Sequence, residues 1–538
     1  MYVLPPPHGY TFARPYPNPE KRLDLGLKRL QVLRGFLGTP SESTNRSMAM
    51  KRRKFIKSTG SGIAAALVGA GALAGCSVGS MARGGDRNRT GIAEENSKAG
   101  DDRWAPRHNA SGMDLPVQGY TTRESVAPGE TLEFCISSEQ AYQIEIHRIG
   151  WYGGAGGRPL TTVEGHPLSQ PKPRPQVEDR KLVTCDWEVT DRVDVPTDWV
   201  SGLYYARFVP EIAEEVAAFP FVVKEQTPST AAVLQLPMNT LSAYNSWGGA
   251  SLYGHRTADK FDSPGDAVSF DRPYTNPYHS HIAYAIHLIR WMEKEGFDVS
   301  YIVNTDMDRD PDLISNYKLA ICAGHSEFWS VPQYKSFKRA RDQGTNLAFM
   351  GGNMGMWSVD FRSGNHRTYN CDKDDSALMF RNRGMPEAEL TGLKGSGAGL
   401  WKLPNLTVDA SSLDHVWMEG TGFEAGDEVV GVVGHEWDFI AEESPDDLTR
   451  YFHYESGTSQ WDELTGDEDA DVVSYEASSG ATVFHSSTLG YPYQLDPDPT
   501  WDHAWPYSRV RKYKPEVMEP NPQLQNFQRN VFEDLMRS

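Results

Sequence analysis

The chain has 538 residues, with 72 Asp and Glu side chains against 53 Lys and Arg, and it contains five cysteines. This length and cysteine count exclude a small disulfide-stabilised scaffold, and the acidic balance argues against a nucleic-acid-binding protein. The charge is unevenly distributed, because residues 1–76 carry 12 basic and 3 acidic side chains and leave 41 basic against 69 acidic for the other 462. The net charge is therefore +9 up to residue 76 and −28 after it.

Residues 50–76 have the three parts of a secretory signal. A basic stretch, Met-Lys-Arg-Arg-Lys-Phe-Ile-Lys, precedes an uncharged small and apolar run that is too short for an ordinary membrane span, and Leu-Ala-Gly-Cys ends it at Cys76. Arg52 and Arg53 resemble the twin-arginine class, although Lys51 stands where Ser or Thr is usual. The ending resembles a lipobox. A basic stretch beside an Ala/Gly-rich linker is the alternative, but the order of the parts favours an exported, cell-surface or periplasmic lipoprotein, with membrane contact only through a lipid anchor at Cys76.

The segments on either side of this signal lack the features of a packed domain. Residues 1–49 do not fit in front of a signal peptide, so we expect Met48 or Met50 to be the true start and residues 1–49 to be a disordered upstream mis-start. Residues 77–115 are rich in Gly, Ser, Asp, Arg and Asn, with few large apolar side chains. They are expected to form a disordered tether.

Residues 116–225 contain short runs in which apolar and polar residues alternate, with turn residues such as Pro-Gly and Gly-Gly between them. Period-two alternation predicts strands that bury one face. Strands are expected at 131–135, 142–149, 203–209 and 218–223. Such a series of short strands predicts a small antiparallel β-sandwich domain.

Residues 226–538 change to a pattern in which compact apolar runs alternate with helical spacing. Strands are expected at 231–236, 299–303, 319–323 and 347–350, and helices around 282–292 and 331–341. This alternation predicts an α/β domain with an open, mostly parallel sheet covered on both faces. Beyond about 360 the chain is loop-rich and acidic, with further strands expected at 428–433 and 481–485.

Polar clusters follow three of the four parallel strands. The first strand leads into Tyr244-Asn245-Ser246-Trp247-Gly248-Gly249 and then Tyr253; the third leads into Gly-His-Ser-Glu-Phe-Trp at 324–329; and the fourth leads into Gly-Gly-Asn-Met-Gly-Met-Trp at 351–357. In an open parallel sheet the ligand site lies outside the carboxyl ends of the strands. We therefore expect Tyr244, His325, Glu327 and Asn353 to gather at one edge, where an imidazole and a carboxylate suit a metal or acid–base chemistry.

Each of these residues also has a purely structural interpretation. Glu327 would cap the following helix while His325 bonds a backbone carbonyl. Tyr244 would be a core or rim aromatic, and Asn353 a turn residue with positive φ. The convergence of all four favours a functional site.

Nucleophilic catalysis has weaker support in the sequence. A nucleophile elbow at Ser326 requires Gly at both flanks, and Phe328 occupies the second. Cys322 lies within a strand and is expected to be a small buried hydrophobic side chain. The cysteines of the body show no zinc-ligand spacing, and after export Cys135 and Cys185 would be the more natural pair to form a disulfide.

The clusters at 244–249, 324–330 and 351–353 resemble the large-subunit (β-subunit) family of N,N-dimethylformamidase. Arg-Ile-Gly-Trp-Tyr-Gly-Gly at 148–154 and Ser-Gly-Leu-Tyr at 201–204 resemble the β-domain that precedes the catalytic domain in that family. The similarity covers roughly 116–500. It implies a catalytic domain similar to class I glutamine amidotransferases, without their cysteine nucleophile.

The resemblance also implies a mononuclear ferric iron held by two tyrosines and one glutamate. Carried over by motif, Glu327 and Tyr244 are ligands, and Tyr204 is the second phenolate by its spacing, with a tyrosine packed in a strand as its alternative. His325 would be a general acid or base near the metal, and Glu436 the base that activates water, with Asn353 beside them. Hard oxygen donors of this kind favour ferric iron over zinc.

These expectations lead to an exported, metal-dependent hydrolase of a non-peptide C–N bond, with a small neutral amide as its substrate and no nucleic-acid partner. A homo-oligomer and a small accessory subunit are both compatible with the sequence. The alternative is a catalytically silent cell-surface protein whose aromatic loops, with Trp247 and Trp357, bind a glycan or polymer. A third alternative is a serine hydrolase that uses Ser326.

Overall fold

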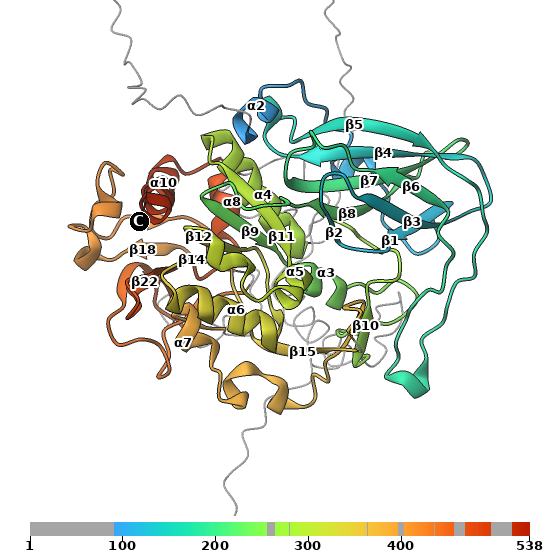
Figure 1. Ribbon diagram of the computed structural model, residues 1–538. Coiled ribbons are helices and arrows are strands. Elements are labelled where there is room, and N and C mark those ends of the chain that lie inside the picture. Colours follow the sequence, from blue (N-terminus) through green and yellow to red (C-terminus); the bar gives the residue numbers. More distant parts are fainter. Residues whose placement is uncertain are drawn as a thin grey trace, which may run out of the picture. The chain divides into compact units, whose positions relative to one another are not determined.

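The computed structural model describes residues 91–254, 264–278, 280–362, 364–395, 403–434, 436–456, 468–496 and 519–537. These residues belong to one compact unit, Gly84–Ser538, which is a mixed α/β structure with several sheets (Figure 1). The predicted signal, Cys76 and the segment upstream of them lie outside the described residues. None of the described helices is both long and apolar enough to span a membrane.

The segment from residue 91 onward packs against the rest of the unit, which differs from the tether expected up to residue 115. It contains helix α2 (Ile92–Asn96) and a short 3₁₀ helix, Pro106–His108. Trp104 is 1% exposed, and its indole N–H donates to the carbonyl of Ala155 at 2.9 Å. A few apolar anchors, Ile92 among them, thus order a segment whose overall composition is polar.

Two sheets form the region after this segment, with four of their strands at the positions expected from the sequence. One sheet has the order β1-β3-β6 and is antiparallel; the other has the order β2-β8-β7-β4-β5 and is antiparallel except for the β2–β8 pair. A Cβ on Gly119 in β1 would lie 3.0 Å from Phe208 in β7, so the two sheets are in contact. The bounds are β1 (Val117–Thr121), β2 (Ser125–Val126), β3 (Thr131–Ser138), β4 (Tyr142–Ile149), β5 (Gly157–Glu164), β6 (Asp191–Asp194), β7 (Gly202–Pro210) and β8 (Ala217–Val223).

A nine-stranded sheet with the order β11-β9-β12-β14-β23-β22-β21-β18-β19 forms the centre of the remaining chain. The pairs from β11 to β23 are parallel, and those from β23 to β19 are antiparallel. The bounds are β9 (Ala232–Leu236), β11 (Val299–Val303), β12 (Leu319–Ala323), β14 (Asn346–Met350), β18 (Leu406–Val408), β19 (Glu428–Val429), β21 (Thr449–Tyr454), β22 (Ala470–Glu476) and β23 (Thr482–His485).

The expectation of a mostly parallel sheet is therefore correct for one half of this sheet only. Strands β22 and β23 are joined by a short turn that contains Gly480 at φ +83°. A turn of this length can only reverse the chain, whereas parallel neighbours need a longer crossover.

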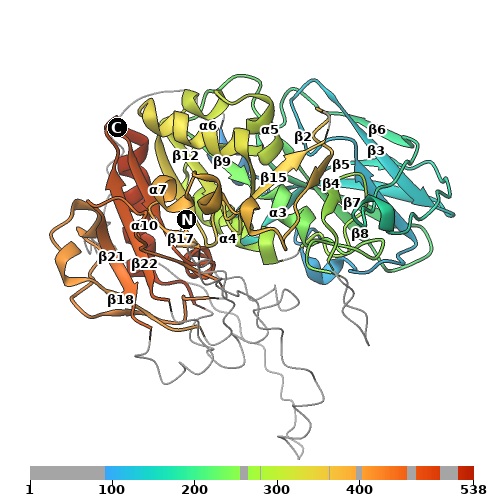
Figure 2. The ribbon, with the colours of Figure 1, turned by 90° about the horizontal axis from the view of Figure 1, so that it is seen from below.

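Alternate side chains along the parallel strands belong to two separate hydrophobic cores. Leu234 of β9 belongs to the same core as Ile282 and Ile286 of helix α4 (Ser280–Glu295). Val233 belongs to the other core, with Tyr334 and Phe337 of helix α6 (Val331–Asp342). Figure 2 shows α4 and α6 on opposite sides of β9 and β12. The expected covering of the parallel strands on both faces is thus present.

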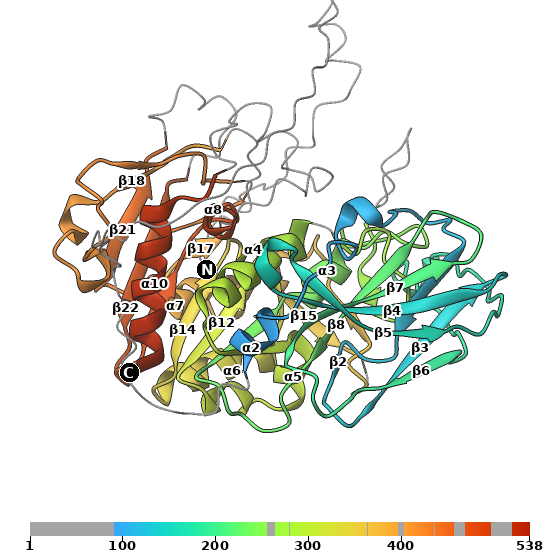
Figure 3. The ribbon, with the colours of Figure 1, turned by 90° about the horizontal axis from the view of Figure 1, so that it is seen from above.

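Helix α10 (Pro522–Arg537) extends the α4 side of the sheet, as seen in Figure 3. Phe532 of α10 packs on Trp291 of α4 with ring centroids 5.9 Å apart. The remaining strands are β10 (Ala267–Ser269), β13 (Phe328–Ser330), β15 (Trp357–Phe361) and β16 (Thr368–Asn370), which form one sheet, and β17 (Lys394–Gly395) and β20 (Asp438–Phe439), which form another. The short helices are α3 (Met238–Ala243), α5 (Asn304–Arg309), α7 (Glu387–Thr391) and α8 (Tyr491–Leu495), with further 3₁₀ turns at Tyr152–Gly154, Val177–Asp179, Leu313–Asn316, Ser376–Leu378, Phe380–Arg383, Ala410–Ser412 and Val416–Met418.

Candidate functional site

The site lies at the carboxyl ends of β9 and β12. At this point of the sheet, strands that follow β9 in the chain lie on both sides of it. Strand β9 has β11 on one side and β12 on the other, so the connections that leave β9 and β12 diverge. Ligand sites of open α/β sheets are found at this kind of position. Here α3 and Tyr244 follow β9, and Gly324 and His325 follow β12.

Glycines allow the turns at the ends of β12 and β14 to approach closely. Gly324 has φ +67°, and a Cβ there would lie 3.0 Å from the backbone N of Ala285 in α4. A Cβ on Gly351 would lie 1.9 Å from the carbonyl oxygen of Gly324. Only glycine fits both positions, because a side chain at either one would meet backbone atoms.

Glu327 is the centre of the site, and two tyrosine hydroxyls donate to its carboxylate. Tyr244 bonds Oε2 at 3.1 Å and Tyr253 bonds Oε1 at 2.5 Å. The two phenol rings stack with centroids 3.9 Å apart. Burial and the Glu327 charge raise the pKa of Tyr244 well above its usual value. Glu327 does not cap α6, because Ser330 accepts the hydrogen bond from the backbone N–H of Gln333.

His325 connects this carboxylate to a second one. Its Nε2 lies 2.8 Å from Glu436 and 3.6 Å from Glu327, and the side chain is fully buried. Burial alone would lower the pKa of His325, but the Glu436 and Glu327 carboxylates outweigh it and raise this pKa. The ring thus has the contacts of a group that takes or gives a proton.

Asn353 occupies the turn after β14 and is 2% exposed. Its φ is +55°, and its backbone N–H donates to the buried carboxylate of Asp438 at 2.5 Å. Asp438 also lies 3.2 Å from His485. The turn-residue interpretation therefore describes the backbone of Asn353, and Asp438 fixes the loop that carries it.

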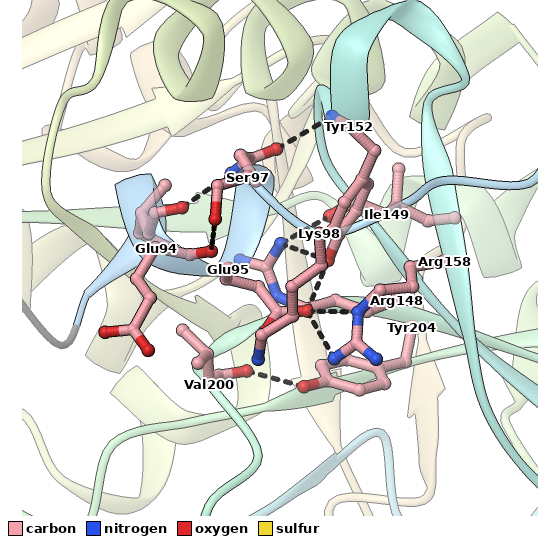
Figure 4. A network of polar contacts seen from close by, with 12 residues as sticks. Glu94, Glu95, Ser97, Lys98, Arg148, Ile149, Tyr152, Arg158, Val200 and Tyr204 are labelled. Atoms are coloured by element: carbon pink, nitrogen blue, oxygen red, sulfur yellow. Dashed lines mark hydrogen bonds and ion pairs between the residues drawn. The ribbon is translucent and has the colours of Figure 1, made fainter.

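Tyr204 lies in a different polar network, shown in Figure 4. Its hydroxyl donates to the carbonyl of Val200 at 2.6 Å, and its ring stacks on Trp199 with centroids 5.3 Å apart. The structure thus corrects the expectation that Tyr204 is the second phenol beside Glu327: the alternative of a tyrosine packed in a strand describes it, and Tyr253 takes that place. The prediction rested on the spacing between Tyr204 and Tyr244 in the sequence. In the structure Tyr204 is part of strand β7, and its side chain is buried in the core of the β-region.

Lys373 is a site residue that the sequence did not indicate. Its Nζ lies 3.7 Å from Oε1 of Glu327 and 3.3 Å from the centroid of the Tyr253 ring, with Trp357 at 5.3 Å. Burial lowers the pKa of Lys373 despite the nearby Glu327 charge. Its neighbours Asp372, Asp374 and Asp375 gave this loop the appearance of a solvated acidic segment.

The aromatic residues expected to bind a polymer are inside the protein. Trp247 is 1% exposed, donates to Oε1 of Gln118 at 2.7 Å and packs edge-on against Trp187. Trp357 is 8% exposed. Trp357 thus lies beside Lys373 of the site, Trp247 joins the segment after Tyr244 to strand β1, and neither buried ring forms a surface platform.

The serine and cysteine side chains also have structural partners. Ser326 Oγ accepts from the indole N–H of Trp329 at 2.8 Å and is fully buried, which does not fit a nucleophile. Cys135, Cys185, Cys322 and Cys371 are buried free thiols, so the expected Cys135–Cys185 disulfide is not formed. Burial raises the pKa of Cys135 to about 11 and so keeps the thiol protonated and unreactive.

These features define a mixed α/β protein with a carboxylate, two phenols and a His–Glu pair at the switch point of a sheet. A family model described as N,N-dimethylformamidase beta subunit-like, C-terminal, matches residues 143–504, and the chain belongs to this family. No curated protein matches the chain in a sequence comparison.

Proposed function

We propose that the chain is a hydrolase of a small neutral amide, cleaving a C–N bond that is not a peptide bond. The observation that carries this proposal is the convergence of Tyr244, Tyr253 and Glu327 beside the His325–Glu436 pair. The family match supports it, since the family is named for a formamidase. N,N-dimethylformamide is accordingly the first substrate to test.

We also propose that Tyr244, Tyr253 and Glu327 hold a ferric ion. Within the described part of the chain, no three His, Cys, Asp or Glu side chains are arranged to hold a metal. The donors of the proposed site are two tyrosine oxygens and one carboxylate. The three donors are hard oxygens, which suit ferric iron. Burial and the Glu327 charge raise the pKa of Tyr244, so its phenolate would form here only together with a bound cation that offsets the charge. When bound, such an ion would supply Lewis-acid polarisation of the amide carbonyl.

The side chains around these donors would move the protons. Glu436 is half-buried and held by His325, so it can take a proton from an attacking water. His325 can pass that proton to the departing amine, since it faces both Glu436 and Glu327. Phe328 and Trp357 line the same space around Lys373 and keep it apolar, which strengthens these interactions.

Metal content and colour test the proposal. We expect the purified protein to contain one iron per chain and to show a visible tyrosinate-to-iron absorption band, with iron and band both lost in Glu327→Ala. An iron-free, colourless protein that still hydrolyses the amide would contradict the metal, and an iron protein inert toward small amides would contradict the reaction.

Export as a lipoprotein is a separate proposal, which rests on the sequence at 50–76. N-terminal sequencing and mass spectrometry of the cell-associated protein are expected to find a lipid-modified Cys76 as the first residue. A chain that retains residues upstream of Met48 would contradict both the signal and the start.

A further inference from the structure

His281 is a second buried histidine beside the site, and it comes from an element with no expected role there. It lies in the first turn of α4, and its Nδ1 is 2.6 Å from Nδ1 of His325. The two rings have centroids 4.4 Å apart, and the His281 ring also packs on Tyr244 at 3.7 Å. His281 is 1% exposed.

The backbone fixes this pairing. A Cβ on Gly324 would lie 3.2 Å from the carbonyl oxygen of His281, so the first turn of α4 rests directly on the turn that carries His325. The two imidazoles thus face each other because of how α4 meets the end of β12. Their contact does not depend on a flexible loop.

A contact between two Nδ1 atoms holds a single proton, because one nitrogen must donate and the other must accept. The other ring nitrogen of His325, Nε2, lies 2.8 Å from the Glu436 carboxylate, whose negative charge favours a proton on Nε2 over a bare lone pair. A neutral His325 then has a bare Nδ1. In this neutral form of His325 the donor in the pair is therefore Nδ1–H of His281.

We propose that His281 is a positioning residue that donates from Nδ1 to Nδ1 of His325 and so keeps the exchangeable proton of His325 on Nε2, facing Glu436 and Glu327. The consequence for catalysis rests on the proposed hydrolase function, but the tautomer itself does not. Without His281, the proton of His325 can occupy Nδ1, where it is directed away from both carboxylates.

Nuclear magnetic resonance of the ring nitrogens tests the tautomer directly. The probe is metal-free, full-length protein with ¹⁵N-labelled histidine rings, and the His325 signals are assigned by their loss in His325→Gln. We expect the wild type to show a protonated Nε2 and an unprotonated, hydrogen-bonded Nδ1 at His325. In His281→Phe we expect a mixture of tautomers. Unchanged His325 signals in a folded His281→Phe protein would overturn the proposal.

Two amide variants provide the matched comparison. In His281→Asn the side-chain amide can occupy the position of Nδ1, whereas in His281→Gln it reaches only the position of Nε2. We expect Asn to retain the His325 tautomer and most of kcat. We expect Gln and Phe to lose roughly 10- to 100-fold in kcat with KM little changed, which is the usual cost of losing a hydrogen-bond partner that orients a histidine at a metal site. Equal loss in Asn and Gln would overturn the proposal. If no variant or wild type hydrolyses amides but the tautomers behave as expected, the proposed function fails and the role of His281 stands.

Discussion

Tyr253 and Tyr204 are the two candidates for the second tyrosine that would bind the metal together with Tyr244 and Glu327. Tyr253 and Tyr244 each donate to one oxygen of this carboxylate, while Tyr204 bonds a backbone carbonyl in the β-region. We therefore expect Tyr253→Phe to lower iron content and to shift or remove the visible absorption band. Tyr204→Phe is the matched control and should keep both, at a cost of about 1 kcal/mol in the free energy of unfolding from one lost hydrogen bond. Metal analysis, spectra and denaturant titration distinguish the two, and loss of iron in Tyr204→Phe alone would reverse the assignment.

The role of Glu436 as a base leads to a second prediction. Glu436→Gln keeps the shape and a hydrogen-bonding group at 2.8 Å from His325 but removes the proton acceptor. We expect kcat to fall by about 10²- to 10⁴-fold, which is the usual contribution of a general base, while iron content and folding stay unchanged. Steady-state kinetics on the iron-loaded protein measures this. Retention of wild-type kcat would remove Glu436 from the mechanism.

Of the residues that the structure brings together around Glu327, sequence reasoning named those that follow a strand, and the family resemblance added Glu436. It gave no role to the residues that come from other elements. Tyr244, His325 and Glu327 come directly after buried strands or a short helix, so the topology of a parallel sheet brings them together. Tyr253, His281 and Lys373 come from a loop, the start of a helix and an acidic segment. Their positions depend on how α4 and these loops pack in the folded protein. The spacing of residues in the sequence does not predict that packing.

At the scale of elements, helix α2 is attached to the rest of the protein by buried polar contacts (Figure 4). Glu95 accepts hydrogen bonds from Tyr152 at 2.9 Å and Arg158 at 2.7 Å and pairs with Lys98 at 2.7 Å. Burial alone would raise the pKa of Glu95, but Lys98, Arg148 and Arg158 outweigh it and lower this pKa. The ionised carboxylate therefore stabilises the folded state.

We expect Glu95→Gln to lower the free energy of unfolding by about 1–3 kcal/mol at neutral pH. Because the folded pKa lies below the unfolded value near 4.5, this stabilisation is fully present above about pH 4.5 and is lost as the pH falls through the folded pKa. The difference between wild type and variant should shrink over that acidic range in denaturant titrations. Glu94→Gln is the control, since Glu94 is exposed and points away from the network in Figure 4. A difference that stays constant with pH would contradict this role of the Glu95 charge.

The elements themselves were predictable where their burial was uniform. Strands β9, β11, β12 and β14 are buried along their whole length and agree with the expected runs to within one residue, because a strand covered on both faces is a continuous apolar run. The expected strand at 428–433 is reduced to Glu428–Val429, since it lies at the end of the sheet and pairs only with β18. Strands β21 and β22 were not expected, because they lie in an acidic, loop-rich segment.

For the whole molecule, the β-region and the nine-stranded sheet share their interior. Arg148 of β4 pairs with Glu293 of α4 at 2.8 Å, and both side chains are fully buried. Residues of both regions belong to the same hydrophobic core, and Trp247 beside the site bonds Gln118 in β1. The domain boundary at residue 225 is a prediction from the sequence. The buried ion pair, the shared core and the Trp247–Gln118 hydrogen bond link the regions before and after that residue, so each region contributes to the stability of the other.

We therefore expect thermal unfolding of the full chain in one cooperative transition. Arg148→Met should lower its midpoint without splitting it, because removing one partner leaves Glu293 buried and unpaired at a cost of about 3–5 kcal/mol. Lys338→Met, which removes the exposed pair with Asp342 on α6, should leave the midpoint within experimental error. Calorimetry measures all three proteins under the same conditions. Two separated transitions in the wild type would show that the β-region unfolds independently, and the site would then lose the support of Gln118 before the sheet itself melts.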